Sequence, residues 1–189
     1  LGQVLGWLTG DGWLRDNDRN CRVGFTFGNN DNEALNYLKP IINTYYGDAI
    51  TEVKRTNNTT HLSYHSKYFV NFFKQLGIKP VGAAEKTVPE TIFTAPRDAV
   101  IGYLQGLFTT DGTIGAQEKN SIMYIRLTSK SKKLLKQTQL LLLNFGIKTR
   151  IYNRSRKPRD KLFRYITTNG EERFYASDGI LFELQISRE

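Results

Sequence analysis

An internal repeat with a period of 100 residues is the feature of this sequence that most limits how it can fold. The stretch VLGWLTGDG at residues 4–12 returns as LQGLFTTDG at residues 104–112, with Gly, an apolar pair, Thr, Asp and Gly at the same offsets. The register continues downstream, where RVGFTFGNNDNEALNYL from Arg22 matches IMYIRLTSKSKKLLKQT from Ile122. The repeat predicts two copies of one structural unit, related by an approximate twofold axis.

Each copy shows the same predicted order of helices and strands. The apolar run before each Asp-Gly pair predicts a helix, because Gly commonly follows a helix C-terminus. A strand of alternating character comes next, and then an amphipathic helix at about 32–46 or 132–144 that stops at Gly47 or Gly146. The strand residues expected to face the core are Val23, Phe25, Phe27, Met123, Ile125 and Leu127.

The predicted class is α+β, with two αββαββα repeats at residues 1–96 and 97–189. In the first copy a last helix is predicted at about 67–76. In the second copy the strand-like FELQIS is followed only by Arg188 and Glu189, so the C-terminal helix of that copy is expected to be missing. The repeats therefore predict pseudo-twofold symmetry that is broken at one end.

Small residues recur one helical turn apart along both predicted motif helices, at Gly6, Gly10, Gly102, Gly106 and Thr110. Residues spaced in this way share one face of a helix. Small side chains on that face allow two helix backbones to approach closely, as in small-xxx-small pairs. We therefore expect the two motif helices to pack against each other at the interface between the copies.

This packing would bring Asp11 and Asp111 side by side. Either Asp-Gly pair alone is adequately explained as the end of a helix, although a carboxylate is unfavourable at the negative end of the helix dipole. Two adjacent carboxylates repel each other unless a divalent cation lies between them, and hard oxygen ligands suit Mg²⁺ or Mn²⁺. The expected metal ligands are Asp11, Asp111 and the preceding Gly10 and Thr110.

The charge of the chain is +9 and is unevenly distributed. Residues 1–96 carry 10 Lys and Arg against 9 Asp and Glu, whereas residues 97–189 carry 17 against 9. Such an excess suggests a nucleic-acid partner, with a solvated basic loop at residues 148–164 as the alternative. Cys21 is the only cysteine, which excludes an internal disulfide and favours an intracellular location such as cytoplasm, nucleoid or organelle. No apolar run is long enough to predict a membrane span.

The predicted strands carry polar residues opposite their apolar faces, a mixture suited to reading base edges and binding phosphates from a DNA groove. A solvated sheet face is the alternative for each strand taken alone. The candidate DNA-binding residues of the first copy are Arg22, Thr26, Asn29, Lys54, Arg55, His61, Ser63 and His65. Those of the second copy are Tyr124, Arg126, Thr128, Ser129, Arg150, Tyr152, Arg154, Arg156, Arg164, Glu183, Gln185 and Ser187.

The two motifs at residues 4–12 and 104–112 resemble those of the LAGLIDADG homing endonucleases, in the single-chain form with two motifs. The resemblance implies motif helices at the interface, a DNA-binding saddle of antiparallel sheets, and a monomer that binds double-stranded DNA. It also implies an endodeoxyribonuclease that makes a double-strand break in a long pseudo-symmetric target by divalent-metal-dependent hydrolysis, with no small-molecule cofactor. Asp11 and Asp111 match the metal-binding acids of that family.

The segment before the second motif resembles the intein-encoded branch of the same family, and by that likeness Lys86 in EKTVPE is a catalytic lysine. A surface lysine paired with Glu85 or Glu90 is the alternative. Asn29 and Ser129 match polar positions near the metal-bound water network of the family. No second lysine of this type and no protein-splicing motif is present in the sequence.

Two other functions stay open at the level of sequence. A non-cleaving binder that kept the fold, such as an RNA maturase or a DNA-binding regulator, would also need the basic strands. A small-molecule enzyme is disfavoured, because the sequence has no nucleotide-binding loop and no nucleophile–base arrangement. A zinc site at His61 and His65 is disfavoured because a third ligand is missing.

Overall fold

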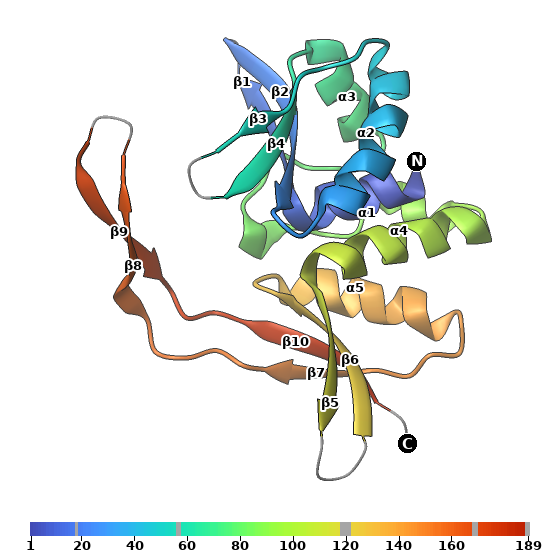
Figure 1. The fold of residues 1–189 in the computed structure, drawn as a ribbon. Coiled ribbons are helices and arrows are strands. Elements are labelled where there is room, and N and C mark those ends of the chain that lie inside the picture. The colour runs from blue at the N-terminus through green and yellow to red at the C-terminus, as the bar shows by residue number, and fades with distance from the viewer. Residues whose placement is uncertain (18, 56–57, 118–121, 168–169, 188–189) are drawn as a thin grey trace.

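The computed structural model describes residues 1–17, 19–55, 58–117, 122–167 and 170–187 (Figure 1). The first copy has the predicted order of elements, including the predicted last helix. Its elements are α1 (Gly2–Asp11), β1 (Gly12–Asn17), β2 (Asn20–Gly28), α2 (Asn32–Tyr46), β3 (Val53–Lys54), β4 (Thr59–Tyr64) and α3 (Lys67–Gln75). The short 3-10 helices Ala83–Glu85 and Glu90–Thr94 lie in the segment that leads to the second copy.

The first sheet is antiparallel and has the strand order β1-β2-β4-β3. The alternation predicted in β2 is confirmed, since Val23, Phe25 and Phe27 are at most 1% exposed. Helix α3 covers this apolar face, and Phe73 from α3 packs edge-on against Phe25 with ring centroids 6.3 Å apart. Burying such aromatic side chains contributes roughly 1.5–3 kcal/mol each.

The second copy repeats the order helix, two strands, helix and strand, and then departs from it. Its elements are α4 (Arg97–Asp111), β5 (Gly112–Gln117), β6 (Ile122–Ser129), α5 (Lys132–Leu143), β7 (Arg150–Asn153), β8 (Arg159–Ile166), β9 (Glu172–Ser177) and β10 (Phe182–Ser187). The strand order β5-β6-β10-β7 reproduces that of the first sheet. Strands β8 and β9 form a separate two-stranded sheet, an insertion that the predicted αββαββα pattern did not contain.

The two motif helices α1 and α4 pack against each other through the predicted small residues. A methyl group added at Gly6 would lie 2.1 Å from the carbonyl oxygen of Tyr103, and one at Gly106 would lie 2.3 Å from that of Gln3. The helices therefore meet backbone to backbone, with no room for a side chain. The predicted end of α1 at the Asp-Gly pair is confirmed; Gly12 follows it in an extended conformation, and the space beside Leu8 requires glycine there.

The apolar face of the second sheet is largely uncovered, in contrast to that of the first. Only Leu127 of the three alternating residues in β6 is buried, while Met123 is 67% and Ile125 40% exposed, so their expected burial is wrong. The physical reason is that no helix of the described residues packs over this part of the sheet as α3 does in the first copy.

None of the described helices has the length and apolar character needed to cross a bilayer.

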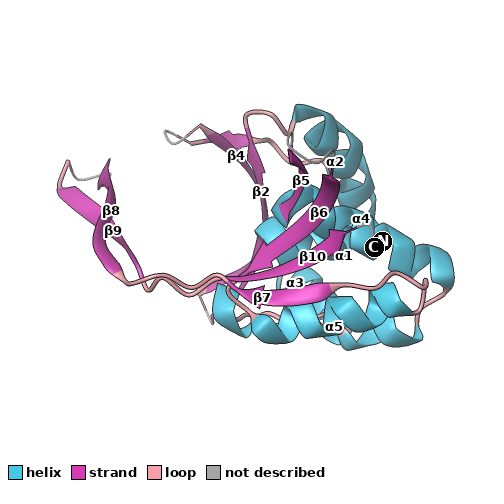
Figure 2. Ribbon diagram, turned by 90° about the horizontal axis from the view of Figure 1, so that it is seen from below, coloured by secondary structure: helices cyan, strands magenta, loops and turns pink. Residues whose placement is uncertain are grey.

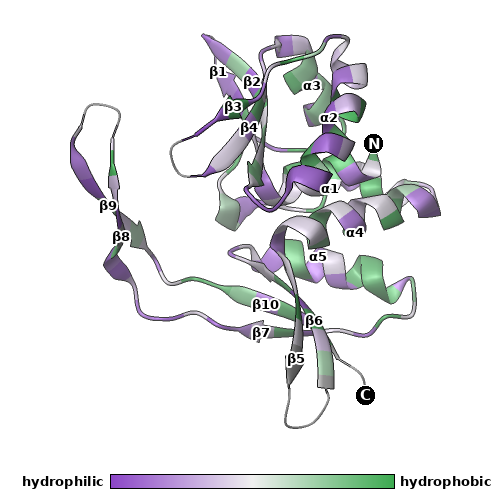
Figure 3. Ribbon diagram, viewed as in Figure 1, coloured by the Kyte–Doolittle hydropathy of each residue, from purple (hydrophilic) through white to green (hydrophobic). Residues whose placement is uncertain are grey.

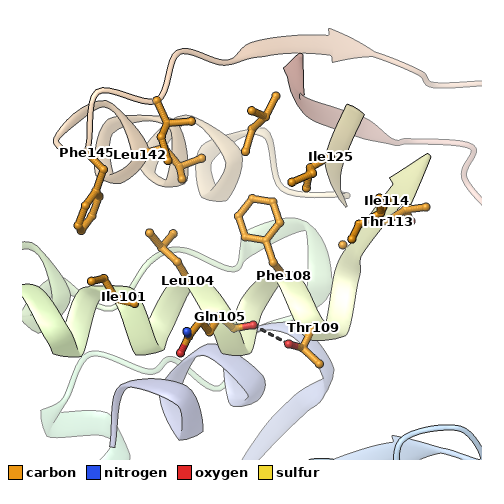
Figure 4. A pocket seen from close by; sticks show the side chains of 13 residues that line it. Ile101, Leu104, Gln105, Phe108, Thr109, Thr113, Ile114, Ile125, Leu142 and Phe145 are labelled. Atoms are coloured by element: carbon orange, nitrogen blue, oxygen red, sulfur yellow. Dashed lines mark hydrogen bonds between the residues drawn. The ribbon is translucent and has the colours of Figure 1, made fainter. Parts of the chain in front are cut away.

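An open pocket of about 640 Å³ marks this uncovered face, between α4, α5, β5 and β6 (Figure 4). The side chains of Leu104 and Phe108 from α4 point toward Leu142 and Ile125 across it. Its lining is almost entirely apolar and offers no cluster of acids or bases for chemistry. The pocket is therefore the result of the missing helix over this face, and it is not suited to binding a polar substrate.

Candidate functional site

Asp11 and Asp111 lie together where the paired helices α1 and α4 end. A methyl group at Gly10 would lie 3.3 Å from a carboxylate oxygen of Asp111, so the acid of one helix reaches the backbone of the other. Loss of water around the carboxyl groups raises the pKa of both aspartates, and it raises that of Asp111 to about 6 with the help of the Asp11 charge. The pair is thus a cluster of negative charge in which the two carboxylates disfavour each other's ionisation.

Lys86 is the cation that reaches this cluster. Its amino group donates hydrogen bonds to the carbonyl oxygens of Gly10 and Gly12, which flank Asp11. Burial lowers the pKa of Lys86, while the charges of Asp111 and Asp11 oppose that change. The structure therefore places Lys86 beside both aspartates and pairs it with neither Glu85 nor Glu90.

The backbone that carries Lys86 is held by the second copy. The hydroxyl of Ser131 donates a 2.7 Å hydrogen bond to the carbonyl oxygen of Lys86, and also caps α5 by accepting from Leu134 N–H at 3.1 Å. Val88 N–H donates to the side-chain oxygen of Gln137 at 3.0 Å. The sequence predicted none of these long-range contacts; the only available signal was a serine at the start of a helix.

The donor set at the helix ends fits a divalent cation. Two carboxylates with raised pKa values are the hard oxygen ligands that Mg²⁺ and Mn²⁺ prefer, and a cation would remove their repulsion. The carbonyl of Gly10, an expected ligand, is already the acceptor of the Lys86 ammonium. The Thr110 hydroxyl bonds back to Leu107 at 2.9 Å, which leaves its backbone carbonyl as its possible donor. No group of three or more His, Cys, Asp or Glu within the described ranges forms another metal site.

The first sheet displays a polar face opposite its core. In the antiparallel register, Thr26 lies across from His61, and Gly24 lies across from Ser63. Arg55 donates to the ring of His61 at 3.4 Å, and loss of water lowers the pKa of His61. Lys54 pairs with Thr60 and so has the register of the opposite face, but its side chain is exposed at the edge strand, and its contact with DNA stays a prediction.

Two further residues on this face were missed by the sequence analysis. Trp13 packs its ring over Gly24, where a methyl group would come within 2.1 Å of it. The guanidinium groups of Arg15 and Arg22 each lie 5.3 Å from the Trp13 ring centroid. The clue available in the sequence was a small residue opposite an aromatic one, which only the strand register makes visible.

The second sheet brings its predicted polar residues into rows. Glu183 lies between Thr128 and Tyr152, and Gln185 lies between Arg126 and Arg150, across three neighbouring strands. Ser187 pairs with Tyr124 in the backbone register, and its side chain lies outside the described part of the structure. The expected clustering of these side chains on one surface follows directly from the period of two along each strand.

Glu183 departs from the expected role of a groove contact. Its side chain is only 8% exposed and accepts hydrogen bonds from Arg154 at 3.1 and 3.3 Å, while Arg126 lies 3.6 Å away. A carboxylate buried under two arginines orients them and is not free to accept from a base. Glu183 thus positions the cations of this face, which explains its unusual burial.

The remaining predicted residues lie at the edges of the polar surface. Ser129 shares the core-facing register of Leu127, and its hydroxyl accepts from Ser131 N–H at 3.1 Å; its predicted role near the metal-bound water stays a prediction. Asn29 is exposed in the turn after β2, and His65 follows β4 with its ring 3.2 Å from the Ser63 hydroxyl. Arg156 and Arg164 belong to the projecting segment beyond β7, where Arg164 lies 3.5 Å from Glu172.

Comparisons with known proteins agree with this geometry. Residues 98–177 match the family model described as a LAGLIDADG-like domain. The ribonucleoside-diphosphate reductase NrdEB subunit alpha of Bacillus subtilis (strain 168) is 39% identical over 88 residues, 45% of this chain. A DNA polymerase of Thermococcus kodakarensis is 27% identical over 151 residues, 78% of this chain. The chain spans only 8% of the length of either relative.

Solved structures match the fold over almost the whole chain. The crystal structure of I-DmoI in complex with DNA and Mn has a TM-score of 0.64 and 18% identity, covering 98% of this chain and 88% of that one. Meganuclease I-SmaMI bound to uncleaveable DNA has a TM-score of 0.53 and 13% identity, covering 98% and 78%. Residues 98–177 thus match a LAGLIDADG-like domain, and the whole chain, with its two paired motif helices and two four-stranded sheets, has the fold of these solved homing endonucleases.

Proposed function

We propose that this chain is a site-specific DNA endonuclease that makes a double-strand break with the help of Mg²⁺ or Mn²⁺. The observation that carries the proposal is the meeting of Asp11, Asp111 and Lys86 at the ends of two helices packed backbone to backbone. Two carboxylates and one partly desolvated ammonium suit phosphodiester hydrolysis, in which negative charge develops on phosphate oxygens. The solved structures with this fold hold Mn or Ca beside DNA.

In this proposal the two aspartates bind the divalent cation, and Lys86 stabilises the negative charge that develops on the phosphate. A bound metal would supply an activated water and stabilise the leaving oxygen. Lys86, fixed by the carbonyls of Gly10 and Gly12, would orient water or stabilise the phosphate as charge develops on it. Its lowered pKa keeps proton exchange with a nearby water less costly than for a solvated lysine.

The two sheets would supply the DNA-binding surface. Residues 1–96 and 97–189 would each contact half of a long pseudo-symmetric target, with the polar sheet faces in the major groove and the aspartates at the minor groove between them. Arg22, Thr26, His61 and Ser63 would act in one half, and the Arg126–Gln185–Arg150 row in the other. We propose a monomer of intracellular origin, of the intein-encoded type.

A library cleavage assay tests the proposal. The parent protein is incubated with a randomised duplex library and Mg²⁺ or Mn²⁺, and broken ends are sequenced. Cleavage at a defined site is expected, and Asp11→Asn, Asp111→Asn and Lys86→Met should each lower it at least 100-fold while binding to that site persists. Lys79→Met, at an exposed lysine outside the site, serves as the control and should cleave like the parent.

The outcomes separate the nuclease from the non-cleaving alternative. Tight binding to one duplex without cleavage in either metal would overturn the nuclease proposal and support a maturase or regulator. Undiminished cleavage by Asp111→Asn would exclude the paired aspartates as the metal site. Equal losses in Lys86→Met and Lys79→Met would remove the special role of Lys86.

A further inference from the structure

A long two-stranded arm, residues 154–181, projects from the edge of the second sheet (Figures 1 and 2). In the first copy the equivalent connection between β3 and β4 spans only residues 55–58. The arm comprises β8, β9 and the segments that join them to β7 and β10, paired by bonds such as Arg156 N–H to the Gly179 carbonyl at 2.8 Å. It lies on the strand side of the molecule, away from the helices (Figure 2), and nearly all of its described residues are exposed.

The polar face of the second sheet runs directly onto this arm. Arg150 and Tyr152 share one side of β7 by the period of two, and Arg154 and Arg156 follow at the same spacing beyond the end of the strand. The Arg154 guanidinium lies 5.0 Å from the Tyr152 ring centroid, and Glu183 holds it in place. The surface proposed to contact DNA therefore extends beyond the four-stranded sheet without interruption.

A concave cluster of cations lies where the arm begins. A pocket of about 380 Å³ is lined by five Lys and Arg side chains from two segments of the chain, together with small and apolar residues. These five cations are Lys130, Arg154, Arg156, Lys157 and Arg159. We call this group the arm-base cluster. In Figure 3 the segment that leads from β7 to β8 is largely purple (hydrophilic), whereas the segment that leads into β10 is partly green (hydrophobic).

The ion pairing within the arm-base cluster is incomplete. Lys130 pairs with Asp178 at 3.0 Å, and Arg154 pairs with Glu183 at 3.1 Å. No carboxylate in the described part of the chain pairs with Arg156, Lys157 or Arg159, which converge on the same pocket. Three exposed, unpaired cations around a concavity are suited to binding the regularly spaced phosphates of a nucleic-acid backbone.

We propose that the arm is a second DNA-binding element, which grips the phosphate backbone on the flank beyond the half-site contacted by residues 97–189. The proposal rests on the proposed function, since it requires that the two sheets bind double-stranded DNA. The arm-base cluster seats phosphates at the edge of the target, and the arm follows the duplex outward. The complex is therefore asymmetric, because the first copy has no equivalent arm.

The length of the arm limits how many additional base pairs it can contact on one flank of the target. Each of its strands has about 12 residues at roughly 3.3 Å each, so the arm reaches at most about 40 Å. One base pair occupies about 3.4 Å along the duplex, so the contacts extend over up to about 10 additional base pairs on one flank. A symmetric enzyme would show no such difference between its two flanks.

Exposed apolar residues on the arm point to a competing use of it. Phe174 and Tyr175 in β9 are 42% and 56% exposed, and Ile166 in β8 is 67% exposed. Such side chains could instead pair two copies of the chain through their arms. The unpaired cations of the arm-base cluster favour DNA, because they would repel the same cluster of a second copy.

The test uses the whole chain and two variants with equal charge. The arm-base variant carries R156A, K157A and R159A, and the control carries K79A, K133A and K136A, three exposed lysines outside the arm. Hydroxyl-radical footprints and salt-dependent binding are measured on a long duplex centred on the site cleaved by the parent. The parent should protect more base pairs on one flank, and the arm-base variant should lose that excess.

The salt dependence gives a second readout. Each phosphate contact contributes about 0.9 to the slope of log affinity against log salt, so the arm-base variant should lose two to three units of slope and the control less than one. Equal footprints on the two flanks, or equal slopes for both variants, would overturn the arm proposal while leaving cleavage intact. Loss of self-association in the arm-base variant with unchanged DNA contacts would assign the arm to pairing of two copies. Failure of the parent to bind any duplex would refute the proposed function instead.

An arm-shortened variant guards against indirect effects. Residues 156–179 are replaced by Asn-Gly, which forms a two-residue hairpin turn next to the paired ends Arg154 and Leu181. We expect circular dichroism to show a folded protein, and its footprint on the target to protect the two flanks equally. Retention of the longer footprint after this deletion would rule out the arm as its source.

Discussion

Ser131 donates a 2.7 Å hydrogen bond to the carbonyl oxygen of Lys86, across 45 positions of the chain. The contact joins the start of α5 in the second copy to the segment whose side chain reaches the carbonyl of Gly10 in the first. The lysine beside the aspartates is thus held from both copies. Its position depends on their correct relative placement.

Ser131→Ala should lower the rate of DNA cleavage by more than its loss of folding stability explains. The substitution removes both the α5 cap and the bond to Lys86, and loss of a cap costs about 1 kcal/mol. Ser66→Ala is a matched control, since Ser66 caps α3 by accepting from Phe69 N–H without any bond to Lys86. Both variants should unfold at similar urea concentrations, while only Ser131→Ala lowers the single-turnover cleavage rate, by roughly 10-fold. Equal rates in the two variants would show that the Lys86 bond has no positioning role.

Asp111→Asn should change how the stability of the metal-free protein depends on pH. The pKa of Asp111 is raised to about 6, so its folded state binds a proton more tightly than the unfolded chain does. The resulting stabilisation is full below the unfolded pKa near 3.8 and is lost as the pH rises through about 6. The neutral variant should therefore gain about 1–2 kcal/mol on the parent between pH 4 and pH 7.

Urea unfolding in the presence of a chelator, at several pH values, measures this difference. Asp178→Asn is the control, because hydrogen bonds from Lys130 and Ile180 N–H lower the pKa of this exposed carboxyl. The contribution of Asp178 is present above its unfolded pKa and is lost as the pH falls through the folded value, the opposite sign. A parallel pH profile for Asp111→Asn and the parent would contradict the raised pKa.

Gly6→Ala should weaken the interface between the motif helices. The added methyl group would lie 2.1 Å from the carbonyl oxygen of Tyr103, so α1 and α4 must separate. We expect a loss of about 1–3 kcal/mol in the free energy of unfolding, despite the better helix propensity of alanine. Gly82→Ala, where nothing lies within 4 Å of the added carbon, should change stability by less than about 0.5 kcal/mol. Denaturant unfolding distinguishes them, and equal stabilities would mean that the helices separate at no cost.

Leu14→Lys and Ile114→Lys test the difference between the two sheet faces. The residues are equivalent in the repeat, but Leu14 is 9% exposed under α3 and Ile114 is 72% exposed. Lysine at position 14 should cost several kcal/mol, because its charge would be buried without a partner. At position 114 the cost should stay within about 0.5 kcal/mol, and binding of a hydrophobic dye should fall. A large loss of stability at position 114 would show that this face is covered in solution.

Most of the fold could be predicted from the internal repeat and from the small residues along the motif helices. The pairing of α1 with α4 followed from Gly6 and Gly106, because a face of small residues has few uses other than close helix contact. The polar rows of the second sheet followed from alternation along β6 and β10. Such local periodicities are visible in sequence since each depends on a single strand or helix.

The predictions that were wrong or missed share a different cause: the burial and contacts of these residues depend on segments that are distant in the sequence. Ile125 reads as a core residue in its own strand, yet its burial depends on whether another helix covers it. Glu183 reads as a groove contact, but Arg154 and Arg126 surround it. The roles of Ser131 and Gln137 beside Lys86 depend on the docking of the two copies, which no short pattern encodes.

The arm leaves and re-enters the second sheet at adjacent points, since Arg154 N–H bonds to the Leu181 carbonyl at 2.9 Å. A chain that departs and returns across one step of a β-ladder can change in length or sequence without moving the strands that support it. The position is therefore a natural insertion point, at which hairpins of different composition could be exchanged as cassettes. Engineers could use it to alter flank preference while leaving the paired aspartates as they are.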